Sequence, residues 1–413
     1  MPDNKTDEEQ KFESACRFII RLGTLAHGYG PHARRLESYL SRVTTALGYR
    51  GIFASTPNSL SFTFMEKEGD LWQKQHIVEL PGTGFNLAKL ARVGELVNDV
   101  EEGKVSIDQA TGILDEIDAM PPPYRNWMVA LAFALCGAGF AGFLRGSWTD
   151  ILLATIFSLV IFLMVTYPGH SPSRFADWTP FLCALVAGAL SALAGFLLPG
   201  TNVYLVTLSA IIYLIPGFSI SVGVIELTTK HYLSGIANLI NGLICLALLF
   251  AGSWLGVTAV GAVLPAHAAA AGSIGAAWVW PFAMLLAAGL VIAFQTPPRD
   301  LFWALACCAV ACAGIVIGVH IQGNNMGNFL GTALAMIFAN LWAGRTNRPT
   351  SIVILPAFVF MVSGSIGFRG LVAISSGSTA LGLTEFTHMF VVAITLAVGL
   401  VVGNLVYRPK ITL

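Results

Sequence analysis

Residues 233–255, LSGIANLINGLICLALLFAGSWL, run for 23 consecutive positions without a charged side chain. An α-helix rises about 1.5 Å per residue, so roughly 20 apolar residues cross the hydrocarbon core of a bilayer. Within that core only a helix or a closed barrel satisfies every backbone N–H and C=O group. The stretch therefore predicts a transmembrane helix.

Further apolar runs of similar length lie on both sides of this one. They cover residues 127–144, 149–167, 180–198, 202–222, 276–294, 300–319, 326–343, 351–368 and 386–407. Tryptophan and tyrosine residues stand near many of their ends, where amphipathic rings favour the lipid–water interface. The pattern predicts an α-helical integral membrane protein with about ten transmembrane helices.

The composition agrees with lipid as the main solvent of the chain. Hydrophobic residues make up 55% of the 413 positions and charged residues only 11%, and the mean hydropathy is +0.71. Of the 23 basic and 23 acidic residues, 14 and 18 lie at or before Arg125, which leaves 9 and 5 for the rest of the chain. Membrane lipid is thus a predicted partner, and the zero net charge argues against nucleic acid.

Residues 1–125 are predicted to form a small α+β domain ahead of the membrane helices. Apolar residues recur at helical spacing over residues 9–27, and Pro31 suits the first turn of a second helix. A helix begins near Asn86, and Ser106 with Gln109 forms a capping box that opens another. Between the two helix pairs, alternating hydrophobicity predicts three strands, at residues 52–54, 60–64 and 77–80.

The orientation follows from the start of the chain and from the loop charges. The acid-rich first residues have no apolar core behind a basic start, so no cleavable signal peptide is expected and the domain stays cytoplasmic. With ten spans, eight basic residues fall in the cytoplasmic loops and ends, and only Arg145 and Arg369 fall in the outer loops. We expect a multi-pass inner-membrane protein with both termini in the cytoplasm.

Weak internal similarity predicts two repeats. Asp150-Ile151-Leu152 resembles Asp300-Leu301-Phe302, and Thr201-Asn202 ahead of one Gly-containing break resembles Thr346-Asn347 ahead of another. Five spans per copy is an odd number, so the second copy has to enter the membrane upside down. The membrane part is therefore predicted to be two inverted five-helix repeats, residues 126–260 and 276–408.

The matching helix breaks are the first candidates for a substrate site. Ile215-Pro216-Gly217 interrupts the fourth span, and Val362-Ser363-Gly364-Ser365 interrupts the ninth. A broken helix exposes N–H groups and a positive dipole end to a carboxylate, and free carbonyls to an amine or cation. The alternative is a simple kink that neighbouring helices stabilise. The backbone positions predicted to bind substrate are Pro216, Gly217, Ser219, Ser363, Gly364 and Ser365.

Polar side chains inside the spans are the second group of candidates. Glu226 and Arg369 follow the two breaks and are either interfacial anchors or buried charges that bind substrate or carry a proton. Glu385 and His388, three residues apart, form a candidate proton relay or a solvated helix start. The amide clusters Asn238/Asn241 and Asn324/Asn325 either bind substrate or hydrogen-bond between helices. The proton-coupling candidates are Glu226, Glu385 and His388.

The N-terminal domain also contains candidate residues for a catalytic or metal site. His27, His32 and Glu37 gather near a helix break, but residues 1–125 contain no nucleophile elbow, phosphate loop or paired Cys/His ligands. The interpretation we favour is a gating or assembly domain rather than an enzyme. The seven cysteines lack metal-site spacing and are expected to be small core residues. No cofactor and no metal are predicted.

Three segments resemble the threonine/serine exporter (ThrE) family. They are Gly28-Tyr29-Gly30-Pro31-His32-Ala33-Arg34-Arg35-Leu36-Glu37, then Ile215-Pro216-Gly217 with Glu226-Leu227 and Tyr232-Leu233-Ser234-Gly235, and Gly364-Ser365-Ile366-Gly367-Phe368-Arg369-Gly370-Leu371. The resemblance covers nearly the whole chain. It implies export of threonine and serine driven by the proton motive force, which makes a small amino acid and protons the expected partners.

The chain departs from the family pattern at two of these positions. Ser363 stands in place of a proline, and Glu226 in place of an aspartate. Because some relatives handle dicarboxylates, a dicarboxylate exporter remains an alternative. A membrane channel with a cytoplasmic gating domain is another, and a homo-oligomer stays open.

Overall fold

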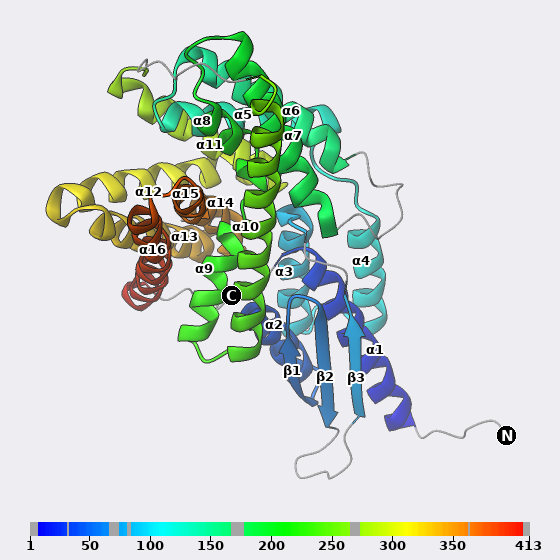
Figure 1. The fold of residues 1–413 in the computed structure, drawn as a ribbon. Helices are drawn as coiled ribbons and strands as arrows, with labels where there is room; N and C mark the ends of the chain where they lie inside the picture. Colours follow the sequence, from blue (N-terminus) through cyan, green and yellow to red (C-terminus); the bar gives the residue numbers. More distant parts are fainter. Residues whose placement is uncertain are drawn as a thin grey trace.

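The computed structural model describes residues 7–30, 33–65, 74–80, 84–166, 177–264, 273–361 and 364–407. Its N-terminal region, residues 7–119, combines four helices with a three-stranded sheet, as the sequence predicts (Figure 1). The elements are α1 (Asp7–Gly28), α2 (Ala33–Ala46), β1 (Arg50–Ser55), β2 (Ser59–Met65), β3 (Lys74–Glu79), α3 (Leu87–Glu101) and α4 (Ile107–Ala119). The predicted capping box of Ser106 and Gln109 opens α4.

The sheet is antiparallel, in the order β1-β2-β3, and one face of it carries the core of the N-terminal region. Along β2 the burial alternates, so that Leu60, Phe62 and Phe64 point inward. Phe53 of β1 pairs with Phe62 in the register and packs edge-on against it. Every second side chain of the strand thus points toward the helices, which explains the alternating hydrophobicity that predicted the strands.

The rest of the chain is helical, and its elements match the predicted spans closely. They are α5 (Asn126–Phe143), α6 (Trp148–Thr166), α7 (Thr179–Leu197), α8 (Val203–Ala210), η3 (Ile212–Leu214), α9 (Gly217–Thr228), α10 (Tyr232–Gly261), η4 (Ala276–Trp278), α11 (Val279–Ala293), η5 (Pro298–Asp300), α12 (Leu301–Gln322), α13 (Asn324–Thr346), α14 (Ser351–Met361), α15 (Gly364–Ser375) and α16 (Thr379–Val406). In the described part of the chain, nine segments are long and apolar enough to cross a membrane, and the bent pair Val203–Ala210 with Ile212–Thr228 makes a tenth.

The predicted break in the fourth span is present. The fourth span bends by 55° where α8 gives way to η3 and α9. Pro216 precedes the first turn of α9, and the Gly217 N–H donates to the Ile215 carbonyl at 2.8 Å. The ninth span, Ser351–Ser375, is helical up to Met361 and from Gly364 onward. The predicted break at Val362 and Ser363 lies outside the described residues.

Two expectations about the ends of the spans are wrong. The last helix begins at Thr379 rather than at residue 386, so Glu385 and His388 lie in its second and third turns. Its first turns contact α15 closely, since a β-carbon at Gly382 would lie 2.7 Å from the Gly370 carbonyl oxygen. Arg369 is not in a loop but inside α15. Packing against the neighbouring helix extends both elements beyond what hydropathy alone predicts.

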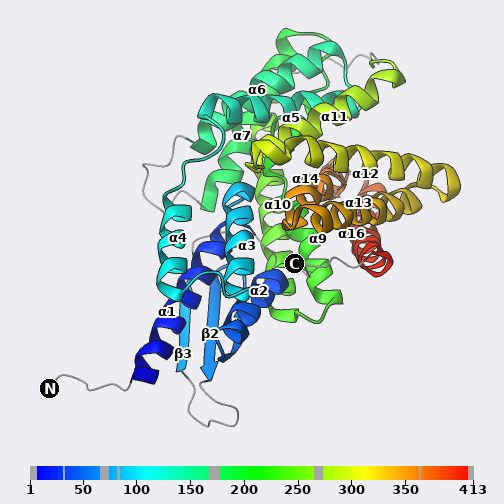
Figure 2. The ribbon, with the colours of Figure 1, turned by 180° about the vertical axis from the view of Figure 1, so that it is seen from behind.

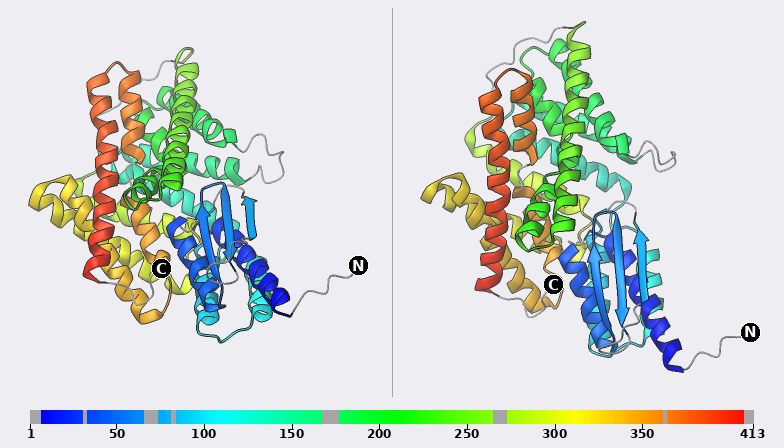
Figure 3. Two further views of the ribbon diagram at one scale, coloured as in Figure 1. Left: turned by 90° about the horizontal axis from the view of Figure 1, so that it is seen from below. Right: turned by 60° about the horizontal axis from the view of Figure 1, so that its bottom comes forward.

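Helices α9 and α10 form a close pair, and α15 and α16 form a second pair built in the same way (Figure 3). A β-carbon at Gly223 of α9 would lie 2.8 Å from the Gly235 carbonyl oxygen of α10. In the second pair, a β-carbon at Gly370 would lie 2.9 Å from the Gly382 carbonyl oxygen. Glycine is required at all four positions because the two backbones approach within contact distance.

Helices α5 and α11 cross in an antiparallel pair. Gly139 of α5 contacts Leu286 of α11, and Gly289 of α11 contacts Cys136 of α5. Each helix ends in a left-handed residue, at Arg145 (φ 61°) and Gln295 (φ 55°) respectively. The same two hydrogen bonds close each end, which is the Schellman arrangement.

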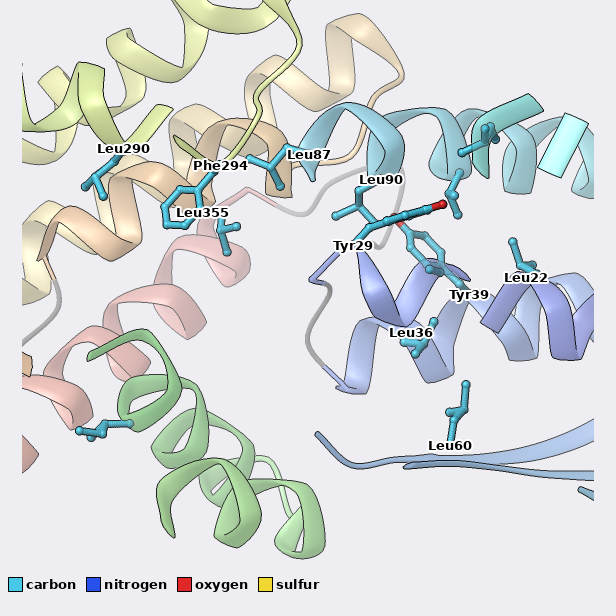
Figure 4. Packing of buried hydrophobic residues seen from close by; sticks show 14 of the residues in the cluster. Leu22, Tyr29, Leu36, Tyr39, Leu60, Leu87, Leu90, Leu290, Phe294 and Leu355 are labelled. Atoms are coloured by element: carbon cyan, nitrogen blue, oxygen red, sulfur yellow. The ribbon is translucent and has the colours of Figure 1, made fainter. Parts of the chain in front are cut away.

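One apolar cluster joins the N-terminal region to the helical part. Figure 4 shows Leu87 of α3 beside Phe294 and Leu355, with Tyr29 and Leu36 of the N-terminal region close by. Seen from behind, α2 and α3 lie between the sheet and the helical part (Figure 2). The N-terminal region is therefore packed onto the ends of the membrane helices rather than tethered at a distance.

Candidate substrate site at the paired helix breaks

The break before α9 contacts α15. A β-carbon at Gly364 would lie 2.6 Å from Ile215 Cγ2 and 2.7 Å from the Gly217 Cα, so the two backbones meet with only hydrogen atoms between them. Gly217 is the first residue of α9, and Gly364 is the first described residue of α15. The N-terminus of α9, with its free N–H groups and positive dipole end, therefore lies against α15.

Small polar side chains and aromatic rings surround this meeting point. Ser219 and Ser365 lie in the first turns of the two helices and are half-buried. The Ser221 hydroxyl, one turn into α9, is buried and has no hydrogen-bond partner among the described residues. Phe218 packs edge-on against Phe358 with ring centroids 6.2 Å apart. The surroundings provide hydroxyl groups and apolar walls, which suit a small polar ligand.

Glu226 is buried at the end of α9 that faces the N-terminal region. Only 2% of the residue is exposed. One carboxylate oxygen, Oε2, accepts from Ser234 Oγ at 2.7 Å and from Asn238 Nδ2 at 2.8 Å. The Glu226 side chain is therefore enclosed between α9 and α10. Asn241 does not join this cluster, because it is exposed on another side of α10.

Arg369 and Glu385 form the second charged cluster, on α15 and α16. Arg369 Nη2 donates to Glu385 Oε2 at 3.2 Å, while Arg369 Nε is buried without a partner in the described part of the chain. Tyr204 of α8 lies within electrostatic range of both charges, and its ring stacks on Phe368 at 6.3 Å. The sequence alone did not single out Tyr204. His388, one turn beyond Glu385, is half-buried.

The other predicted amide cluster lies elsewhere. Asn324 and Asn325 begin α13 directly after Gly323, which takes φ 85° in the turn between α12 and α13. Both side chains are exposed at the tip of that hairpin, away from the two breaks (Figures 1 and 2). The structure therefore brings Glu226, Asn238, Arg369 and Glu385 onto the helix pairs that carry the breaks, and leaves this pair outside.

The N-terminal region reaches the same place from one end. Phe85 packs edge-on against Phe218, next to the break, at 5.1 Å and against Phe294 at 4.7 Å. The first N–H groups of α3, from Leu87 and Ala88, donate to the Phe294 and Gln295 carbonyls at the end of α11. The free donors of one helix thus satisfy the free acceptors of another.

The glycine-rich segment 28–37 takes part in this junction. Arg35 donates to the Thr350 hydroxyl at 2.9 Å, and Glu37 Oε2 lies 3.3 Å from His231 Nε2. His27 contacts the Thr56 carbonyl within the N-terminal region, whereas His32 lies outside the described residues. Described members of the segment therefore act as contacts between the two parts of the chain, a role that sequence inspection did not identify.

Charged groups strengthen the same junction. Glu95 of α3 accepts from Arg299 at 2.6 Å. Arg348 donates to the buried carboxylate of Asp300 at 2.5 Å and lies 3.8 Å from Glu95. Because several charges share this network, it stabilises the contact between the N-terminal region and the helical part more than an isolated surface ion pair would.

In the described part of the chain, nine or ten segments can span a membrane, one of them broken, and they define a multi-pass membrane protein. Two family models match the chain, one for ThrE over residues 17–260 and one described as "Threonine/Serine exporter, ThrE" over residues 279–406. The chain belongs to the ThrE family, which is a family of transporters and not of enzymes.

Curated relatives agree with this assignment. The chain is similar to a "Probable threonine/serine exporter" of Mycobacterium tuberculosis, 26% identical over 78% of this chain and 63% of that protein. It is similar to a "Threonine/serine exporter" of Corynebacterium glutamicum, 24% identical over 98% of this chain and 85% of that one. A third relative is "Pheromone-regulated membrane protein 10" of Saccharomyces cerevisiae, 23% identical over 55% and 30%. No solved structure matches.

Proposed function

We propose that this protein is a secondary active transporter that exports threonine, serine or a similar small amino acid from the cytoplasm. The observation that carries the proposal is the contact of Gly364 in α15 with Gly217, where α9 begins after the break in the fourth span. The N-terminus of α9 at this contact favours a carboxylate. The names of the bacterial relatives point to the same substrate class.

We further propose that the membrane part consists of two inverted five-helix repeats, residues 126–260 and 276–408. A shift of 147 positions turns Gly223 and Gly235 of one helix pair into Gly370 and Gly382 of the other, and their close contacts are the same. The same shift turns Gly217 into Gly364. Two equivalent residues that touch each other lie on the pseudo-two-fold axis, as in an isologous interface.

The crossing of α5 and α11 supports the inversion. With a shift of 150 positions, the contact of Gly139 with Leu286 becomes the contact of Gly289 with Cys136. The two helices run antiparallel, as equivalent helices of inverted repeats must. The left-handed Arg145 and Gln295 are related by the same shift.

The charges around the breaks favour a zwitterion over a dicarboxylate. Two carboxylates, Glu226 and Glu385, accompany one guanidinium, Arg369. An amino acid can offer its carboxylate to Arg369 and the helix N-termini and its ammonium group to an acidic side chain. A second ligand carboxylate would meet carboxylates instead, so the dicarboxylate alternative gains no support from the charge balance.

Proton coupling is proposed because a buried carboxylate in a membrane protein needs a partner or a task. Glu226 is the first candidate for the proton carrier, and Glu385 with His388 the second. The orientation proposed from the loop charges puts the N-terminal domain, residues 1–125, and both termini in the cytoplasm, in the inner membrane. Glu226 then belongs to the cytoplasmic end of the site and Arg369 to the outer end.

Counterflow in proteoliposomes tests the proposal. Vesicles loaded with unlabelled threonine should accumulate labelled threonine and serine, and a panel of dicarboxylates should neither exchange nor compete. Net threonine movement should follow an imposed proton gradient and stop when an uncoupler removes it. Exchange of dicarboxylates alone, or a saturation-free ion current without exchange, would overturn the amino-acid exporter in favour of the dicarboxylate exporter or the channel.

A further inference from the structure

Ser234 and Asn238 of α10 bind the same oxygen of the Glu226 carboxyl on α9. Ser234 Oγ lies 2.7 Å and Asn238 Nδ2 lies 2.8 Å from Glu226 Oε2. Asn238 Nδ2 also lies 3.4 Å from Ser234 Oγ, so the three groups form one closed cluster. Ser234 is 4% exposed and Glu226 is 2% exposed. The hydrogen bonds to Glu226 are therefore largely shielded from water.

The backbones of α9 and α10 hold this cluster together. In the sequence Gly235 follows Ser234, and Leu227 follows Glu226. A β-carbon at Gly235 would lie 2.9 Å from the Leu227 nitrogen. A β-carbon at Gly223, about one turn before Glu226, would lie 2.8 Å from the Gly235 carbonyl oxygen. Because the two helices are packed this closely, the two donors of α10 are kept within hydrogen-bonding distance of the carboxyl.

The hydrogen atoms of this cluster point toward Glu226 Oε2. An amide nitrogen only donates, so Asn238 Nδ2 cannot accept an O–H from a protonated Oε2. Its second hydrogen atom faces Ser234 Oγ, which leaves the hydroxyl hydrogen of Ser234 for Oε2. Hydrogen bonds donated to the ionised form of a carboxyl favour that form. The cluster therefore stabilises ionised Glu226, and a proton that binds this carboxyl is carried on Oε1.

We infer that Ser234 and Asn238 are positioning residues of the proposed proton carrier, which hold Glu226 Oε2 and leave Oε1 to exchange the proton. Neither residue is assigned contact with the substrate, so Asn238 acts through Glu226 rather than as a substrate ligand. The second half has no counterpart of this cluster, because a shift of 147 positions turns Glu226 into Ala373 and Ser234 into Leu381. The inference rests on the proposed proton-coupled export.

Several other charged and imidazole groups lie on the elements around α9. In the described part of the chain they are Glu37, Lys230, His231, Arg369, Glu385 and His388. The charges of Glu37 and Glu226 act on each other, and Arg369 forms an ion pair with Glu385. Substitution of Ser234 or Asn238 removes none of these groups. A shift of the pH profile in such variants therefore comes from the lost hydrogen-bond donor.

Counterflow of labelled threonine by the full-length protein in proteoliposomes, measured across a pH series with equal pH on both sides, tests the inference. Ser234→Ala and Asn238→Leu each remove one donor from Oε2, so the ionised form is less favoured. The midpoint of the pH profile should then move upward by about one to two units, the effect of one hydrogen bond to a charged group. Asn238→Asp keeps the shape of the side chain but places a second acid beside Glu226, and it should move the midpoint in the same direction.

Ser253→Ala is the matched control. The Ser253 hydroxyl is also buried on α10, but it donates to the Phe250 carbonyl of its own helix at 2.9 Å. This variant should keep the wild-type midpoint. When Ser234→Ala is added to Glu226→Gln, the pH profile should not change further, because no carboxyl remains for Ser234 to position.

Several results would overturn the inference. A wild-type midpoint in folded Ser234→Ala and Asn238→Leu would do so. A higher half-saturation constant of Asn238→Leu at an unchanged midpoint would make Asn238 a substrate ligand instead. Size-exclusion profiles in detergent identify variants that do not fold, and Asn238→Asp then decides the role of Asn238. If Glu226→Gln keeps the wild-type pH profile, the proposed role of Glu226 fails and the inference with it, and that result needs no substitution in α10.

Discussion

Replacing Gly364 by alanine places one methyl group at the contact between α15 and the break before α9. Its carbon would lie 2.6 Å from Ile215 Cγ2 and 2.8 Å from the Gly217 nitrogen, and the Gly217 atoms are backbone and cannot rotate away. Carbon atoms attract at about 3.5 Å or more, so α9 and α15 have to separate by roughly 0.8 Å. Overpacking of this kind costs about 1–3 kcal/mol.

The cost applies only to the conformation in which the breaks touch. If the transport cycle passes through that conformation, its population falls by about 5- to 150-fold, the factor that corresponds to about 1–3 kcal/mol. We expect counterflow of labelled threonine by Gly364→Ala to fall within that range. Gly364→Val, with a larger side chain, should abolish it, and Gly217→Val should do the same.

Two control variants separate this effect from general damage. In Gly223→Ala the β-carbon would lie 2.8 Å from the Gly235 carbonyl oxygen, so the crowding is similar but lies away from the breaks. In Gly261→Ala nothing lies within 4 Å. Size-exclusion profiles should confirm that all variants remain folded in detergent. Wild-type counterflow rate and affinity in folded Gly364→Ala would refute the site and return the breaks to simple kinks.

Three further predictions concern charged groups. Glu226→Gln should keep threonine binding but lose the pH dependence of transport, measured as the half-saturation constant and rate across a pH series. Arg369→Lys should weaken binding in the same assay, because a point charge replaces the planar fork that holds a carboxylate. Burial raises the pKa of Glu37 above its ordinary value of 4.5. Protonated Glu37 therefore stabilises the folded state fully below pH 4.5, and this stabilisation is lost as the pH rises through the raised pKa. Glu37→Gln should therefore flatten the fall of Tm over that window, and an unchanged slope would contradict the assignment.

The membrane helices were predictable because length and hydropathy are local properties. The interruption before α9 was predictable for a similar reason, since Pro216 lacks the N–H that a continuous helix needs at that point, whereas the 55° bend lies at Ile211. The contact of Gly217 with Gly364 is different. The sequence shows two similar breaks, but only the arrangement of the helices brings them together.

The direction in which a membrane helix faces its neighbours was not predictable from spacing. Asn238 and Asn241 are three residues apart and were expected to act together, yet Asn238 binds Glu226 and Asn241 is exposed. In a soluble helix the apolar stripe marks the buried side. In a membrane both the lipid side and the packed side are apolar, so that signal is missing.

The junction of the two parts of the chain was also hidden from the sequence. Glu37 and His231 are nearly two hundred positions apart, and each is an ordinary surface residue when considered alone. Only the docking of α2 onto the turn between α9 and α10 makes them a pair. The segment 28–37 was noticed for its glycines and its resemblance to a family, and neither property indicates what it contacts.

The two halves differ in a way that has consequences for transport. In the first half, the large side chain of Ile220 packs against Gly242. The equivalent residues of the second half are Gly367 and Met389, so there the glycine is on the first helix of the pair and the large side chain on the second. The total side-chain volume at this contact is therefore similar in both halves. The charges differ between the two halves. At the same shift of 147 positions, Asn238 corresponds to Glu385. Asn238 hydrogen-bonds to an acid, Glu226, whereas Glu385 pairs with a base, Arg369.

In two identical inverted repeats, the state open to one side and the state open to the other would have equal energy by symmetry. Unequal charges at the two ends remove that equality, and the N-terminal region, which contacts one end through Phe85, Glu95 and Glu37, removes it further. With the proposed inverted repeats, we therefore expect a preferred resting state. Loosening the junction, for example by Glu95→Gln together with Phe85→Ala, should then change the ratio of outward to inward transport rates without changing the final equilibrium. A shift of that equilibrium itself would contradict passive coupling and require another energy source.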